Sequence, residues 1–259
     1  MIKGEWKQFD YSYYIQKVHY VNGEVHRLDG PAIINYIKSN SCDESYLNKE
    51  LWYKNDIQHR NGDKPAVKTY NRFGNLIEVR YFVEGKRHKN NGASVVSFYN
   101  DGSVCCLKYY KNNILSDLEK PSDIEFYTNG KKKYEAYYFN NRVHRDNGAA
   151  IIEYYKDGTI REERYYKNGD LCRVDGPACI MYDTKQNIKC CLYYINHTKL
   201  VKDEYTDLVD RIKSGKIKKS INRFSFKRFK IIYELIKYYG NQELIDLCEN
   251  RLMIEKMKN

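Results

Sequence analysis

Residues 137–164 read YYFNNRVHRDNGAAIIEYYKDGTIREER, and the next 28 residues, 165–192, read YYKNGDLCRVDGPACIMYDTKQNIKCCL. The two segments share an opening Tyr-Tyr pair, an Asn shortly after it, a cationic position three residues before a Gly, and a second Tyr farther on. Self-similarity at a fixed period indicates stacked structural repeats, and it decides the fold before any short motif does.

The same spacing extends along most of the chain. We call the second aromatic residue of each pair the anchor; anchors recur at intervals of 33, 29, 28, 28, 28 and 28 residues. Of the fourteen positions formed by the anchors and the residues before them, thirteen are aromatic, and His19 is the exception. The anchors are Tyr20, Tyr53, Phe82, Tyr110, Tyr138, Tyr166 and Tyr194. The sequence therefore contains six complete repeats and a partial seventh.

Each repeat has the residue pattern of two short strands. Segments such as Ala150–Tyr155 and Arg161–Tyr166 are rich in Ile and Tyr, and Lys156-Asp157-Gly158-Thr159 between them is typical of a hairpin turn. A longer loop carrying the proline position joins one hairpin to the next. We predict a mainly β fold, an elongated antiparallel meander of tandem 28-residue β-hairpin repeats, which advances by about 10 Å per repeat.

The chain divides into three parts by pattern. Residues 1–17 form an N-terminal cap segment, residues 18–201 the repeats, and residues 202–259 a basic α-helical region. In the last part, helices are predicted over Asp203–Ile212, over Phe226–Tyr239 and from about Gln242 to Lys256, with Asn241 as a cap. We expect this C-terminal α-helical cap to cover the open edge of the last hairpin.

One repeat is degenerate. Where its neighbours have His-Arg-x-Asp-Gly-Pro, the repeat that begins at Tyr110 has Ser116-Asp117-Leu118-Glu119-Lys120-Pro121. Its Tyr positions and its Asn129-Gly130 turn are kept. The sequence predicts that the hairpin persists there although the loop has diverged.

The tandem Tyr-Tyr-Lys-Asn-Gly and Tyr-Lys-Asp-Gly turns, at 165–169 and 155–158, resemble MORN-type repeats, in the variant found in antitoxin-like proteins. The His-Arg-x-Asp-Gly-Pro-Ala form is similar to repeat proteins of giant DNA viruses of the mimivirus group. The resemblance covers about residues 18 to 200. It implies a binding or scaffolding module without catalytic residues, placed in the host cytoplasm or the virion. The Gly-x-Trp spacing usual in MORN repeats is missing, so ligand preferences are not transferred.

Two loop columns are the first candidate site. The sixth residue after the anchor is His in four repeats, and the seventh is Arg or Lys in five. Equivalent residues of adjacent hairpins would stand about 10 Å apart, too far to share a metal ion. The alternatives are a structural pair, with each cation bound to the Asp or Asn two residues on or stacked on an aromatic ring, and a line of cations that binds an acidic partner. The candidate residues are His26, Arg27, His59, Arg60, His88, Lys89, His144, Arg145 and Arg173.

A basic segment is the second candidate site. Between residues 211 and 230 there are nine basic residues and no acidic one, within a chain of formal net charge +11. Such a cluster is typical either of a solvated linker and helix face or of a site for nucleic acid or acidic lipid headgroups. The residues are Arg211, Lys213, Lys216, Lys218, Lys219, Arg223, Lys227, Arg228 and Lys230.

The aromatic pairs leave a further alternative. Adjacent strand residues face opposite sides of a sheet, so the two aromatic columns must lie on different faces. One column packs within the repeat, and the other is either covered by loops and helices or exposed as a binding surface for protein or single-stranded nucleic acid.

Several function classes are disfavoured. No catalytic or cofactor fingerprint is found, so we predict no enzyme, no cofactor and no metal site. No apolar run is long enough to cross a bilayer, and the eight cysteines lack a disulfide-framework pattern, which favours a cytoplasmic protein with reduced thiols. The first hypothesis is a non-enzymatic repeat scaffold for protein binding, and the second is a protein that binds nucleic acid or an anionic surface. A single sheet buries limited apolar area, which favours face-to-face dimerisation.

Overall fold

The computed structural model describes residues 4–39, 44–117, 119–240 and 242–257. The side chains of residues 219, 222 and 255–257 lie outside this description. The chain divides into an N-terminal unit, Met1–Arg142 with Lys156–Gly158, and a C-terminal unit, Val143–Tyr155 with Thr159–Asn259.

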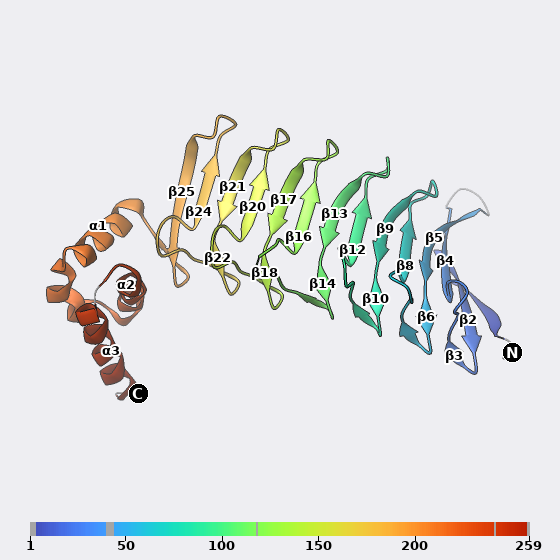
Figure 1. Ribbon diagram of the computed structural model, residues 1–259, viewed down its shortest axis with the longest axis horizontal. Helices are drawn as coiled ribbons and strands as arrows, with labels where there is room; N and C mark the ends of the chain where they lie inside the picture. Colours follow the sequence, from blue (N-terminus) through green and yellow to red (C-terminus); the bar gives the residue numbers. More distant parts are fainter. Residues whose placement is uncertain (1–3, 40–43, 118, 241, 258–259) are drawn as a thin grey trace. The chain divides into compact units, whose positions relative to one another are not determined.

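The N-terminal unit is an antiparallel meander in which each long strand pairs with the next long strand along the chain (Figure 1). This arrangement follows from hairpins that repeat in sequence, and it confirms the predicted fold class. The long strands are β1 (Glu5–Asp10), β2 (Tyr14–Val21), β4 (Ile33–Lys38), β5 (Ser45–Leu51), β8 (Val67–Tyr70), β9 (Leu76–Arg80), β12 (Val95–Phe98), β13 (Val104–Lys108), β16 (Asp123–Phe126) and β17 (Lys132–Ala136).

Residues of the cap segment 1–17 form β1 and the start of β2, which pair with each other; residues 1–3 lie outside the described part. The Asp-Gly turns close the long hairpins as predicted. In one of them the Gly102 N–H donates to the Tyr99 carbonyl at 3.0 Å, and Gly102 has a positive φ of 85°. A register shift of one residue then follows in the same hairpin, between Ser97 and Phe98. A turn followed by a left-handed glycine and a bulge is a common three-residue hairpin loop.

The predicted longer loop contains a second, small hairpin, which the sequence analysis missed. Its strands have two residues each, and two residues of positive φ form the turn, such as Asn112 at 52° and Asn113 at 69°. These angles match the type I′ turn that suits the twist of paired strands. The small strands are β3 (Glu24–Val25), β6 (Tyr53–Lys54), β7 (Ile57–Gln58), β10 (Phe82–Val83), β11 (Lys86–Arg87), β14 (Tyr110–Lys111), β15 (Ile114–Leu115), β18 (Tyr138–Phe139), β19 (Arg142–Val143), β22 (Tyr166–Lys167) and β23 (Asp170–Leu171).

The degenerate repeat keeps this framework. The Asp117 N–H donates to the Tyr138 carbonyl at 3.0 Å, as the Arg27 N–H does to the Tyr53 carbonyl at 3.1 Å in the first repeat. The backbone bond therefore persists although the side chain at this position has changed from basic to acidic.

The C-terminal unit carries the same hairpin pattern and then changes to helices. Its long strands are β20 (Ile151–Tyr154), β21 (Ile160–Arg164), β24 (Cys179–Tyr182) and β25 (Ile188–Ile195), and β26 (Thr198–Leu200) pairs with β25. The helices are α1 (Lys202–Lys213), the 3-10 helix η1 (Lys216–Arg223), α2 (Phe226–Tyr239) and α3 (Gln242–Met257). Three helices match the sequence prediction and η1 was missed, while Asn241 lies outside the described residues.

The main apolar core lies where these helices pack on the last two strands. Phe229, Ile232 and Leu235 of α2 are fully buried, and the same cluster contains Tyr193, Ile195 and Leu200 of β25 and β26. The helices thus cover apolar side chains of the last hairpin in this unit. Their predicted role as a cap on the open strand edge stays a prediction.

Candidate interaction surface

The histidine column links each small hairpin to the next one. In four repeats Nδ1 of the loop histidine accepts the backbone N–H of the first turn residue in the following repeat. The four bonds are Asn55 to His26 at 3.3 Å, Glu84 to His59 at 3.1 Å, Asn112 to His88 at 3.3 Å and Asn168 to His144 at 3.0 Å.

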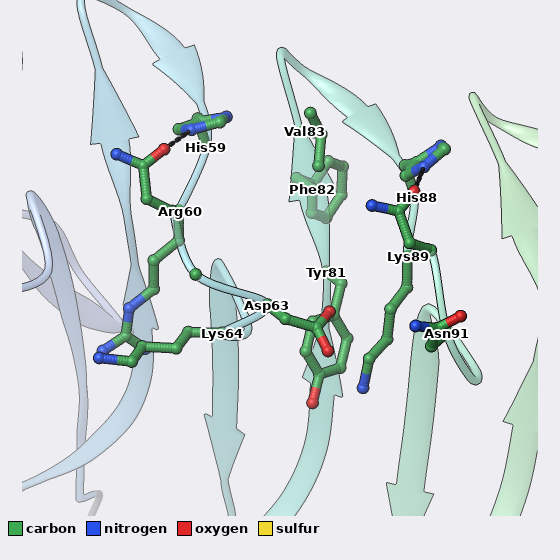
Figure 2. A pocket seen from close by; sticks show the side chains of 13 residues that line it. His59, Arg60, Asp63, Lys64, Tyr81, Phe82, Val83, His88, Lys89 and Asn91 are labelled. Atoms are coloured by element: carbon green, nitrogen blue, oxygen red, sulfur yellow. Dashed lines mark hydrogen bonds between the residues drawn. The ribbon is translucent and has the colours of Figure 1, made fainter.

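The other ring nitrogen binds within its own loop. Since Nδ1 accepts a hydrogen bond, the neutral ring carries its proton on Nε2 and donates from there. His88 Nε2 donates to Asn90 Oδ1 at 2.9 Å, and His59 Nε2 donates to Asn61 Oδ1 (Figure 2). His144 Nε2 lies 3.3 Å from Asp146 Oδ1. Both nitrogens of these rings are engaged in hydrogen bonds. Among the described residues, no three His, Cys, Asp or Glu side chains are grouped to hold a metal ion.

A second set of hydrogen bonds between neighbouring hairpins, which we call the second interlock, uses the second turn residue. The sequence did not predict it. The backbone N–H of this second turn residue donates to the carbonyl of a residue in the preceding small hairpin. Where the turn residue is Asp or Asn, its side chain also accepts the N–H of that same residue in the preceding hairpin. Asn113, for example, donates to the Arg87 carbonyl at 3.0 Å and accepts the Arg87 N–H at 2.7 Å. The same pair of bonds joins Asp56 to Val25 and Asn141 to Leu115, whereas Gly85 and Gly169 make only the backbone bond.

The cationic column packs inside its own loop. Arg60 lies 3.9 Å above the Trp52 ring, Lys89 lies 3.8 Å above Tyr81, and Arg173 lies 3.9 Å above Tyr165. These rings are the residues that precede the anchors, so these three cations cover the aromatic side chains of their own repeats. Arg27 lies over Trp6 of β1 instead, at 5.3 Å. The predicted stacking is observed.

The N–H groups of these arginine side chains also form hydrogen bonds or ion pairs within the loop. Arg27 and Arg173 each bind the Asp two residues on, Asp29 and Asp175, at 2.8 Å. These bonds lower the pKa of both carboxyl groups. The fit is close: a Cβ on Gly30 would lie 2.7 Å from Cζ of Arg27, so a larger residue there would displace the guanidinium group. In Arg60 and Arg145, Nη1 donates to the carbonyls of Pro65 and Ala149 at 3.1 and 3.0 Å.

Open polar grooves separate neighbouring loops. One groove of about 310 Å³ lies between the loops that contain Arg60 and Lys89, and Figure 2 shows Tyr81 and Lys89 side by side in it. A similar groove of about 320 Å³ lies between the loops of Arg27 and Arg60. In the C-terminal unit a groove of about 590 Å³ lies between the loops of Arg145 and Arg173. The grooves recur with the repeat, and hydrogen-bonded loop side chains line them together with apolar residues such as Phe82 and Val83.

Neither aromatic column forms an exposed stripe. All seven anchors are half-buried, and Trp52, Tyr137 and Tyr193 of the preceding column are buried. Of the two alternatives left open by the sequence, the structure therefore favours coverage, because the loop cations lie on one column and neighbouring side chains partly cover the other.

The basic segment forms the end of α1, the helix η1 and the start of α2. Ile217 and Ile221 of η1 are fully buried, so the segment is anchored rather than a solvated linker. Three of its cations have acidic partners: Arg211 with Asp207, Lys218 with Glu243, and Arg228 with Glu204. Lys213 and Lys230 lie over aromatic rings, as Arg211 and Arg228 also do. The side chain of Lys219 lies outside the described part of the chain. Lys216, Arg223 and Lys227 are exposed without an ion pair to a described residue.

Among the described residues, Cys42 being outside them, the seven cysteines are free thiols. Burial raises the pKa of the Cys106 and Cys179 thiols to about 12, and nearby carboxylates add to the effect. Within the described ranges, none of the helices has the length and apolar character needed to cross a membrane.

Comparison with known proteins adds no name to this surface. No family model matches the chain, and no curated protein matches it. The resemblance to MORN-type repeats stays a prediction.

Proposed function

We propose that this chain is a non-enzymatic repeat scaffold that binds another protein along the edge formed by its loops and small hairpins. One observation carries the proposal: the histidine, asparagine and arginine columns hold neighbouring repeats and loops together, and each repeat presents equivalent solvent-facing positions beside them. A surface of repeated positions suits an extended protein partner, and repeat proteins use such surfaces for binding.

The same contacts favour a binding function over catalysis. A catalytic site needs an acid, base or nucleophile that converges on one substrate position. Here the titratable loop groups pair locally, as in Arg173 with Asp175 and His59 with Asn61, and the pattern recurs from repeat to repeat.

Photo-crosslinking tests the scaffold. A benzoyl-phenylalanine at Ile57, which is 49% exposed on a small hairpin, should crosslink a defined partner in cells that naturally contain the protein. The matched position is Phe73, which is 70% exposed on the turn of a long hairpin, and it should not crosslink that partner. Absence of a saturable crosslink at Ile57, or the same products from both positions, would contradict the proposal.

A second candidate function is binding of nucleic acid or an acidic surface by the basic segment. The observation that favours it is the set of exposed cations without acidic partners, Lys216, Arg223 and Lys227. Replacing all three with Gln should reduce retention on heparin or an oligonucleotide. The slope of log binding constant against log salt concentration should become shallower by the contribution of about three ion contacts. The control replaces Lys156, Lys185 and Lys199, which are exposed elsewhere, with Gln. Point variants are preferable to deletion of residues 202–259, because deletion would uncover Tyr193, Ile195 and Leu200.

A further inference from the structure

The small hairpins of the N-terminal unit share a feature that the interlocks do not use. Three consecutive hairpins carry one exposed aliphatic and one exposed basic side chain at directly paired positions: Ile57 with Lys54, Val83 with Lys86, and Ile114 with Lys111. The aliphatic residues are 49%, 41% and 40% exposed. Phe139, 39% exposed, and Arg142 continue the pattern on either side of the next turn.

The two kinds of side chain alternate between the two strands of successive hairpins. The first strand carries Lys54, then Val83, then Lys111, and the second strand carries Ile57, then Lys86, then Ile114. A Cβ on Gly85 would lie 3.5 Å from Cγ2 of Ile57, so Ile57 reaches the turn of the next hairpin. Asn113 of the third hairpin bonds to Arg87 of the second. The six residues therefore lie at the ends of three neighbouring hairpins, and we call them the tip row.

The fold does not require this composition. Two other small hairpins of the same design have Val21 with Glu24 and Lys167 with Asp170 at the paired positions. The anchors and turn residues recur in these hairpins, whereas the apolar-basic pairing does not. A feature that the scaffold can omit is available for function.

The charge of the tip row is positive. The four small hairpins at 53–58, 82–87, 110–115 and 138–143 contain five basic and two acidic residues. One of the acidic groups, Asp56, accepts the Val25 N–H at 2.7 Å. No ion pair joins Lys54, Lys86 or Lys111 to any residue in the described ranges, and their ammonium groups are open to an acidic partner.

We propose that the tip row docks an acidic amphipathic helix of a partner protein. This inference rests on the proposed scaffold function and specifies its partner. Adjacent hairpins are about 10 Å apart, and a helix rises about 10.5 Å in seven residues. A helix with one apolar residue and flanking carboxylates in each heptad therefore matches the spacing and the charge. Aliphatic side chains give no stacking platform for bases, which favours a protein over nucleic acid.

Fluorescence anisotropy with the full chain tests the docking. The probe is a labelled 28-residue helical peptide with one Leu and two Glu in each heptad, and the comparison peptide has Lys in place of Glu. The chain should bind the acidic peptide, and the binding should weaken at least about tenfold in the variant Lys54→Glu/Lys86→Glu/Lys111→Glu. A second variant, Ile57→Ser/Val83→Ser/Ile114→Ser, should weaken it to a similar degree without changing the charge.

The control Lys156→Glu/Lys185→Glu/Lys199→Glu makes the same charge change elsewhere and should leave the affinity within about threefold. Three outcomes would overturn the inference. They are an equal loss of affinity in the control, no binding of the acidic peptide by the wild type, and tip-row-dependent binding of anionic lipid vesicles without binding of the peptide. If the partner that crosslinks at a small hairpin is still captured by both tip-row variants, the inference fails and the scaffold function stands.

Discussion

The hairpin repeats and the helical segment of the C-terminal unit are stabilised in different ways. The fully buried column of the repeats consists of small residues, twelve or thirteen positions after each anchor: Ala32, Ala66, Ser94, Ser122, Ala150 and Ala178. The helical segment buries Phe229, Ile232, Leu235 and Ile236 completely. A column of Ala and Ser contributes little apolar area, so the repeats depend more on hydrogen bonds between neighbours than the helices do.

This difference predicts how far the effect of a substitution spreads through the structure. In a repeat array each unit contacts its neighbours, and stability is a sum of local terms. In the helical segment a change in one buried side chain affects the whole cluster, because the helices and the last strands share one core.

The largest expected effect is in the helical core. Phe229→Ala removes a fully buried ring and should lower the free energy of unfolding of the C-terminal unit by about 3 to 5 kcal/mol. Hydrogen exchange should show loss of protection in α1, α2 and β25, with the N-terminal unit protected as before. Phe226→Ala, at a 42% exposed position of the same helix, is the control, and equal destabilisation there would contradict the comparison.

The next effect is overpacking of the small-residue column. Ala66→Leu adds three carbons where there is no exposed surface and should cost about 1 to 3 kcal/mol. Urea unfolding should show the loss, and hydrogen exchange should localise it to β5, β8 and β9. Val83→Leu, at an exposed tip, should change stability little; if the two substitutions cost the same, the column is not a packing constraint.

Loss of one histidine link should cost less. His59→Ala removes the acceptor of the Glu84 N–H and should lower stability by about 1 kcal/mol. Faster exchange of the Glu84 amide is the local measurement. His197→Ala replaces a histidine whose side chain is 73% exposed outside the column, and it should leave that amide unchanged.

A gain is expected where the second interlock is incomplete. Gly85 has the left-handed φ of 74° that Asn tolerates, and Gly85→Asn would supply a side-chain acceptor for the Gln58 N–H. We expect a gain of up to about 0.5 kcal/mol and slower exchange of the Gln58 amide. Asn113→Gly removes the acceptor of the Arg87 N–H and should speed exchange of the Arg87 amide. Unchanged exchange of both the Gln58 and the Arg87 amides would show that the side-chain hydrogen bond contributes nothing to stability.

The smallest effect is on pH dependence. The hydrogen bond from Arg173 lowers the pKa of Asp175 in the folded state, so the pair stabilises the loop above the unfolded pKa of about 3.9 and loses this contribution as pH falls below it. An NMR titration of Asp175 should give a lower midpoint in the wild-type chain than in the variant Arg173→Gln. Identical midpoints would mean that the bond does not form in solution.

The sequence predicted the hairpins better than the contacts between them. Turn residues such as Asp157-Gly158 and the alternation of Ile and Tyr act over a few residues, so they can be recognised locally. The small hairpins were missed because strands of two residues are too short to show a periodic pattern. The Asn-Asn and Asn-Gly pairs two and three residues after the anchor were the available signal.

By itself the sequence determined the repeat period, the antiparallel hairpins and the helical C-terminal region, because each depends on residues that are close along the chain. Only the tertiary structure decided that His59 binds Glu84, that Ile217 and Ile221 anchor the basic segment, and that Ile57, Val83 and Ile114 lie exposed at the ends of neighbouring hairpins. These contacts join residues in different repeats or different helices. They depend on the distance and angle between neighbouring elements, which backbone pairing and core packing set, and which residue type alone does not specify.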